Sequence, residues 1–94
     1  MSQRILDKIR EKVRLRQYLM TTHAEEEMDD DDLSIFDVER VLLTGKIVEQ
    51  QKDVNTQEHK YLVRGQTMDG STLAVAVTKF GMTGKLMILT VYLE

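Results

Sequence analysis

His23 is the residue best suited to proton transfer in this sequence, because histidine alone has a reference pKa near neutrality, about 6.5. Glu27 follows four residues later, so on a helix the two side chains share a face. They could form an acid–base pair or supply two metal ligands, but a metal would also need His59 or the aspartates brought close by the fold. We expect no metal and no other cofactor, and a helix start or a helix–sheet seam is the plainer role for His23.

Two cationic residues form the second candidate group. Lys60 and Arg64 are four residues apart in a segment of period two, so they share one face of a strand, while Tyr61 points away. Lys79 could lie on a neighbouring strand. Converging cations could hold a phosphodiester and stabilise the charge that develops when it is attacked. The plainer alternative is the polar outer face of a two-layer domain.

Charge is strongly segregated along a chain whose net charge is only -3. Residues 1–23 carry +4, residues 24–40 carry -8, and the remainder carries +1. Such blocks are typical of nucleic-acid or protein contacts, and equally of neighbours that neutralise each other within one fold. The run Asp29 to Asp32 lacks the spaced oxygens and the glycine of a calcium loop, which favours a solvated acidic surface.

The elements that position these residues begin with a basic, amphipathic helix. Ser2 is its predicted cap, and its end is expected near Gln17. Its apolar positions recur at three- and four-residue steps: Leu6, Ile9 and Val13. Residues 18–21 are then expected to be extended. This order predicts a helix followed by a short extended segment.

A second, short helix is predicted over about residues 23–29, because Thr22 and Glu25 fit a capping box. A third helix starts at Ser34, which pairs with Asp37 in the same way. It should end at Gly45, where we expect the left-handed conformation that glycine adopts readily.

From Lys46 onward the hydrophobic period changes to two, which predicts four strands in an antiparallel meander. We place the strands at about residues 46–52, 59–67, 72–80 and 85–93. The last is apolar on both sides and is expected in the interior of the sheet. The third alternates large residues with Ala74 and Ala76, so we expect the large face to pack against helices and the alanines to floor a shallow groove beside Lys60 and Arg64.

The composition favours one soluble α+β domain over residues 1–94, with a helical half at 1–45 and an antiparallel sheet at 46–94. A chain of 94 residues with 41% hydrophobic residues can build one modest core. The absence of cysteine excludes disulfides and thiolate metal sites. No signal peptide and no membrane span is recognisable, so we expect a cytoplasmic protein.

Several short motifs together resemble a known family. They are Tyr18-Leu19-Met20-Thr21-Thr22-His23-Ala24, Met28, Leu33-Ser34-Ile35 with Asp37-Val38, Gly45, and Lys60-Tyr61 before Arg64-Gly65. The chain resembles the domain of unknown function 4258, from about Ile5 to Tyr92. That family is usually grouped with RelE-like toxins, whose fold is N-terminal helices on a four-stranded antiparallel sheet.

The resemblance implies a metal-independent endoribonuclease of a toxin–antitoxin pair, acting on messenger RNA alone or on the ribosome. A small antitoxin, often of zinc-finger type, would be encoded beside it. The family histidine matches His23, and the strand pattern matches Lys60, Tyr61 and Arg64. In such an enzyme the 2′-hydroxyl attacks its own phosphate, so His23 would move protons, Lys60 and Arg64 would support the phosphorane, and Tyr92 is a further proton-donor candidate.

This chain departs from the family pattern at two positions. Many relatives carry arginine where Glu27 and Asp31 stand, and each replacement puts an anion where a polyanion would bind. The sequence pI of about 5.4 is also lower than expected for a protein that binds RNA. Two hypotheses therefore stand: a toxin-like ribonuclease, or a catalytically inert relative that binds a protein through its acidic helix or an open sheet edge. A homodimer is a further expectation.

Overall fold

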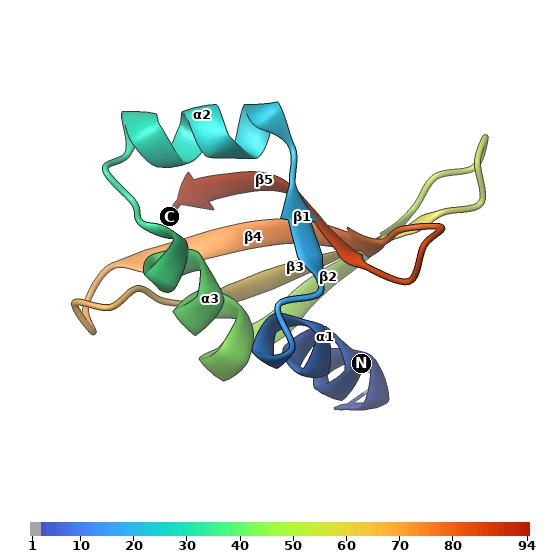
Figure 1. The fold of residues 1–94 in the computed structure, drawn as a ribbon, viewed down its shortest axis with the longest axis horizontal. Coiled ribbons are helices and arrows are strands. Elements are labelled where there is room, and N and C mark those ends of the chain that lie inside the picture. The colour runs from blue at the N-terminus through green and yellow to red at the C-terminus, as the bar shows by residue number, and fades with distance from the viewer. Residues whose placement is uncertain (1–2) are drawn as a thin grey trace.

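Residues 3–94 are described by a computed structural model, in which helices pack against one face of a mixed five-stranded sheet (Figure 1). The elements in chain order are α1 (Gln3–Arg14), β1 (Tyr18–Met20), α2 (Thr22–Asp30), α3 (Ile35–Thr44), β2 (Lys46–Lys52), β3 (His59–Gln66), β4 (Leu73–Phe80) and β5 (Leu86–Leu93). The α+β class and the order of helices before sheet are as predicted. The predicted cap Ser2 lies outside the described residues.

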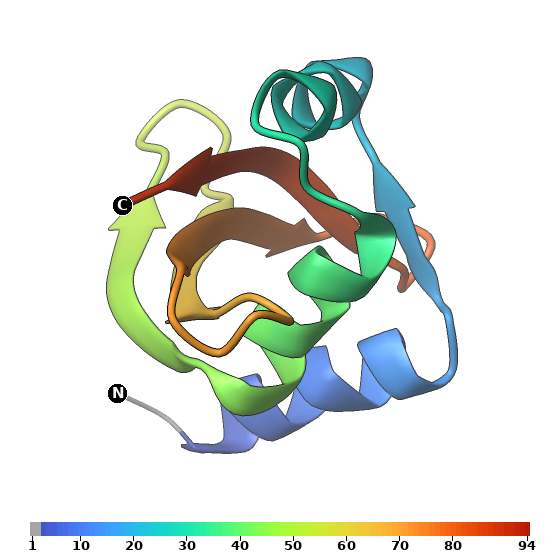
Figure 2. The same ribbon diagram turned by 90° about the vertical axis from the view of Figure 1, so that its left-hand side faces the viewer.

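The sheet has the strand order β1-β5-β4-β3-β2. Strands β2 to β5 form the predicted antiparallel meander. The prediction of a four-stranded antiparallel sheet is wrong in one respect, because β1 pairs in parallel with β5. Three residues show no readable periodicity, and their pairing is set by β5, whose other edge they cover. β5 therefore lies inside the sheet, as its apolar character on both faces requires. Figure 2 shows β1 and β2 on opposite sides of the molecule, with α3 between them.

Two helix boundaries differ from the sequence prediction. α1 ends at Arg14, short of Gln17, because Arg16 takes a left-handed backbone conformation (φ 56°) that stops the helix. The cap of α2 is Thr21 in place of Thr22: its Oγ1 accepts a hydrogen bond from the backbone N–H of Ala24 at 3.1 Å. Thr21 is also anchored to β5, since its N–H donates to the Ile88 carbonyl oxygen at 3.0 Å. The strand pairing thus fixes where α2 begins.

The cap of α3 is the predicted one, since Ser34 and Asp37 form a reciprocal capping box. The predicted left-handed Gly45 is wrong, because its backbone is extended (φ -82°, ψ -171°). Glycine is needed there for another reason: a Cβ at position 45 would lie 2.5 Å from the carbonyl oxygen of Val41. A Cβ at Gly65 would lie 2.9 Å from the same oxygen. The two glycines let α3 pack closely on β3.

The alanines of β4 face the helices, which reverses the predicted orientation of that strand. Ala74 and Ala76 belong to one core cluster with residues of all three helices and with Val63 of β3. Small side chains suit this face because α3 approaches the sheet backbone closely. Lys60 and Arg64 lie on the other face, so the predicted alanine-floored groove beside them does not exist. We call this other face, which the helices leave uncovered, the open face; it carries Lys46, Lys60, Leu62, Arg64, Val75, Val77 and Tyr92.

Candidate functional site on the open face of the sheet

One row of residues crosses four strands on the open face. Lys46 of β2 pairs with Arg64 of β3, Arg64 pairs with Val75 of β4, and Val75 pairs with Tyr92 of β5. Directly paired residues of neighbouring strands point to the same side of a sheet, so these four side chains stand beside one another. Arg64 and Tyr92 are two strand spacings apart, about 10 Å. Val75 between them is only 2% exposed, so its longer neighbours cover it.

Arg64 already holds an anion. Its Nε forms an ion pair with Oε1 of Glu94 at 2.5 Å, and both side chains remain about two-fifths exposed, at 41% and 43%. An exposed pair of this kind contributes little to stability, because water and salt screen it. The pair shows instead that a carboxylate can reach the guanidinium from the direction of β5. Another oxyanion can therefore compete for the same place.

The two other lysines named from the sequence, Lys79 and Lys60, differ in their partners. Lys79 of β4 donates a hydrogen bond to Glu58 Oε2 at 3.0 Å and is neutralised by it. Lys60, half-buried on β3, forms no ion pair within residues 3–94. Of the three predicted cations, Lys60 is thus the one without an ion pair among residues 3–94, and Arg64 is more exposed, at 41%, than Lys79, at 26%.

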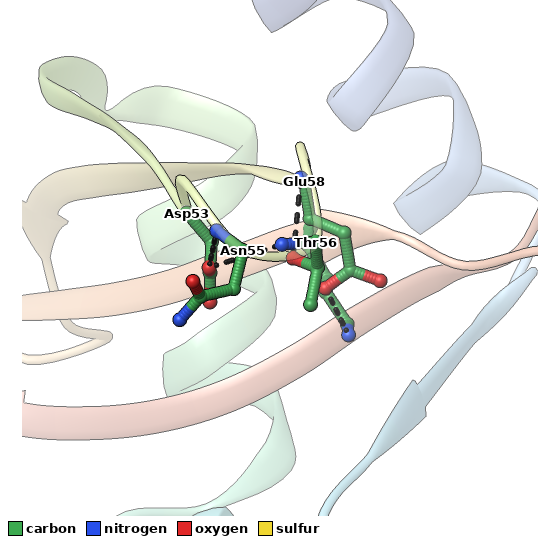
Figure 3. A network of polar contacts seen from close by, with 5 residues as sticks. Asp53, Asn55, Thr56 and Glu58 are labelled. Carbon is green, nitrogen blue, oxygen red and sulfur yellow. Dashed lines mark hydrogen bonds and ion pairs between the residues drawn. The ribbon is translucent and has the colours of Figure 1, made fainter.

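Glu58 is held in place by the loop between β2 and β3 (Figure 3). Oδ1 of Asp53 accepts hydrogen bonds from the N–H groups of Asn55 at 2.8 Å and Thr56 at 3.2 Å. These hydrogen bonds stabilise the ionised carboxylate of Asp53 and so lower its pKa. The Glu58 N–H donates in turn to Thr56 Oγ1 at 3.3 Å. An ordered loop therefore delivers the carboxylate that neutralises Lys79.

His23 is not one of the residues of this row. It sits in the first turn of α2, in the helical layer, and its side chain is 67% exposed. Its Nε2 is 3.4 Å from Oε1 of Glu27, as the four-residue spacing predicts. The same Glu27 oxygen accepts a hydrogen bond from the backbone N–H of Val91 in β5 at 3.0 Å. Glu27 thus ties α2 to the sheet, and His23 is its exposed neighbour.

The structure brings Lys60, Arg64 and Tyr92 onto one face, whereas His23 comes from α2 and is linked to β5 through Glu27, which accepts from the N–H of Val91 directly before Tyr92. Sequence reasoning missed Lys46, which stands beside Arg64 in the row. Its position directly after Gly45, at the start of the sheet, was readable from the sequence. Its pairing with Arg64 was not, because the β2–β3 register contains a bulge at Val48 that no pattern indicates.

Within residues 3–94, no three histidine, aspartate or glutamate side chains gather closely enough to hold a metal ion. No helix of this part of the chain has both the length and the apolar character needed to cross a membrane.

Comparison with known families gives one match. Residues 20–93 match the family described as Domain of unknown function (DUF4258). The chain belongs to this family. No curated protein and no solved structure matches it. The DUF4258 match includes His23, Lys60, Arg64 and Tyr92, and it leaves out α1. The match thus begins later than the resemblance from about Ile5, and both α2 and the open face lie inside it.

Proposed function

We propose that the open face of this DUF4258 domain binds an RNA phosphodiester and cleaves it as a metal-independent endoribonuclease. The observation that carries the proposal is the row in which Arg64 and Tyr92 flank the short, buried Val75. A guanidinium forms paired hydrogen bonds with two phosphate oxygens, which fixes the orientation of the phosphate. A phosphodiester lying over Val75 would then have a cation on one side and a phenol on the other.

The proposed chemistry is attack of the 2′-hydroxyl on its own phosphate. The 2′-oxygen bonds to phosphorus and gives up its proton to solvent water as the bond from phosphorus to the 5′-oxygen breaks, which leaves a 2′,3′-cyclic phosphate and a 5′-hydroxyl. Arg64 stabilises the negative charge that develops on the phosphorane, and Tyr92 donates a proton to the leaving 5′-oxygen and then takes one back from water. Lys60, on the same face of β3, adds positive charge along the strand. Glu94 must release Arg64 before the phosphate binds, since both compete for one guanidinium. The catalytic role of His23 stays a prediction, and the proposed site does not use it.

The biological setting that fits this chemistry is a toxin of the RelE-like class, acting in the cytoplasm on messenger RNA or the ribosome. A small zinc-finger antitoxin would be its partner. The α+β order of helices and meander supports this proposal, while the parallel strand β1 and the anions at Glu27 and Asp31 distinguish the chain from that pattern.

Purified protein should therefore cleave RNA in the presence of chelator, with or without ribosomes. Arg64→Gln and Tyr92→Phe should each reduce the cleavage rate by about 10²-fold, through lost charge stabilisation and lost proton transfer. Arg14→Gln, which removes an exposed cation at the end of α1, is the matched control and should cleave normally. Circular dichroism of each variant checks that the fold is intact. Wild-type protein that neither cleaves RNA nor inhibits growth on induction would end the enzyme proposal.

His23→Ala belongs in the same assay as a test of the separate sequence prediction. A loss as large as that of Arg64→Gln would move the proton-transfer role from Tyr92 to α2. A loss confined to the Arg64 and Tyr92 variants would support the open face.

The second candidate function is an inert protein-binding module. The observation that favours it is α2, where Glu27 anchors the helix and the remaining acids point to solvent with no ion pair among the described residues: Glu25, Glu26, Asp29, Asp30, Asp31 and Asp32. Such a surface suits a basic partner. The free edge of β2 offers a second docking mode, by addition of a strand from a partner or from a second copy. An adjacent gene for a small zinc-finger or DNA-binding protein would favour the toxin, and its absence the module.

A further inference from the structure

A surface hollow of about 310 Å³ adjoins the row on the open face, between the end of α3 and the start of β2. Its walls come from α3, β2, β3 and β4, and it begins beside Arg64. The side chains that line it include Arg40, Thr44, Lys46, Arg64, Gln66 and Leu73. Three of these are cations and none is an acid. The hollow is therefore a concave surface of uniform sign.

The charges of this hollow are largely uncompensated within the protein. Neither Arg40 nor Lys46 forms an ion pair within residues 3–94, and only Arg64 has one, with Glu94 outside the lining. Cations held close together in a hollow repel one another, and an anion placed among them removes that repulsion. The hollow thus has the electrostatic character of an anion site.

Arg10 of α1 adds a fourth positive charge next to the hollow, although it is not a lining residue. Its guanidinium donates from Nη2 to the carbonyl oxygen of Gly45, a lining residue, at 2.8 Å. Its Nε is buried with no hydrogen-bond partner, and no carboxylate of the described residues pairs with it. A buried donor without a partner is uncommon in a folded protein. Arg10 and the three cations of the lining therefore make the electrostatic potential in the hollow more positive.

We propose that this hollow is a phosphate subsite, which holds the phosphate next to the one bound over Val75 on the same RNA strand. The inference rests on the proposed function, because it is Arg64, shared between the row and the hollow, that joins the two places. Arg40 supplies a second guanidinium group, whose paired N–H donors can bond two oxygens of one phosphate. Lys46 supplies a point charge beside them. The subsite would position the strand without taking part in bond cleavage.

The test is a titration of isotope-labelled protein with inorganic phosphate and with a 5′-phosphorylated diribonucleotide whose attacking 2′-hydroxyl is replaced by hydrogen so that it cannot be cleaved, followed by amide chemical shifts. Both ligands should shift the amides of Thr44, Lys46 and Gln66 saturably, and the diribonucleotide should bind more tightly. Arg40→Gln should weaken both affinities by about tenfold, and Arg14→Gln, the matched arginine control, should leave them unchanged. An acidic peptide of equal charge serves as the competitor.

The outcomes separate this proposal from the preceding one. Saturable shifts that depend on Arg40, in protein that does not cleave RNA, would support the subsite. The same result would contradict the ribonuclease proposal only. RNA cleavage with an unchanged KM in Arg40→Gln would overturn the subsite and leave the enzyme proposal standing. Tighter binding of the acidic peptide than of the diribonucleotide would also overturn it, in favour of a protein ligand.

Discussion

At the scale of single residues, one hydrogen bond joins Tyr18 of β1 to Glu39 of α3. The phenol donates to Glu39 Oε2 at 2.5 Å. Burial, and then this hydrogen bond to a carboxylate, raise the pKa of Tyr18 to about 12. The fold therefore favours the neutral phenol, whereas in the unfolded chain tyrosine ionises near pH 10.

Tyr18→Phe should lower the free energy of unfolding at neutral pH by about 1–3 kcal/mol, because a hydrogen bond to a charged acceptor is lost. The contribution of Tyr18 is complete below the unfolded pKa of about 10 and is lost as pH rises through the folded pKa of about 12. The difference in stability between wild type and variant should therefore shrink across this window. Urea denaturation at intervals from neutral pH to about 12 measures it, and a constant difference would contradict the assignment.

At the scale of elements, α2 is held to the sheet by one carboxylate. Glu27 accepts from the Val91 N–H, and Ala24 and Met28 bury the apolar side of the helix. Position 27, where the family resemblance leads one to expect arginine, is part of the connection between α2 and β5. An arginine there could not accept this hydrogen bond, because a guanidinium has donors only.

Glu27→Ala should lower the free energy of unfolding by about 1–3 kcal/mol, since it leaves a backbone donor without its charged acceptor. Glu27→Gln keeps an acceptor oxygen and should cost less. Glu26→Ala, the exposed neighbour, is the matched control, with an expected change within about 0.5 kcal/mol. Hydrogen exchange at Val91 should accelerate most in Glu27→Ala. Equal exchange rates in the Glu26 and Glu27 variants would show that the contact is not formed in solution.

At the scale of the whole molecule, opposite charges gather at different places. The exposed acids of α2 and its C-terminal turn have no ion pair among the described residues, while the hollow beside Arg64 is uniformly basic. The net charge of -3 therefore describes neither surface. A phosphate backbone would be attracted to the hollow and repelled by α2, which restricts how an RNA strand could cross the open face.

Added salt should raise the melting temperature, because it screens repulsion among the acids of α2. The double variant Glu26→Gln/Asp30→Asn should melt higher than wild type at low salt, by about 2–4 °C for a gain near 0.5 kcal/mol, and should respond less to salt. Glu11→Gln, on the basic helix α1, is the control and should not reduce the salt response. Calorimetry from about 10 mM to 500 mM NaCl tests this, and parallel salt curves for both variants would refute it.

The sequence by itself determined the elements, because their signals are local. The capping box of Ser34, the change of period after Gly45 and the turns between strands depend on neighbouring residues, and they place three helices and four strands within a few residues. Alternation along β3 likewise put Lys60 and Arg64 on one face and Tyr61 on the other. The family membership also followed from short local motifs.

Only the tertiary structure decided how these elements meet. β1 is too short to show a period, so its parallel pairing depends on β5. The direction of Ala74 and Ala76 was predicted the wrong way round, because large side chains suggest a core whereas here a close helix needs small ones. The row from Lys46 to Tyr92 depends on registers that a single bulge can shift, and the place of His23 depends on the contact that Glu27 makes between α2 and β5. These are long-range contacts, and no stretch of neighbouring residues encodes them.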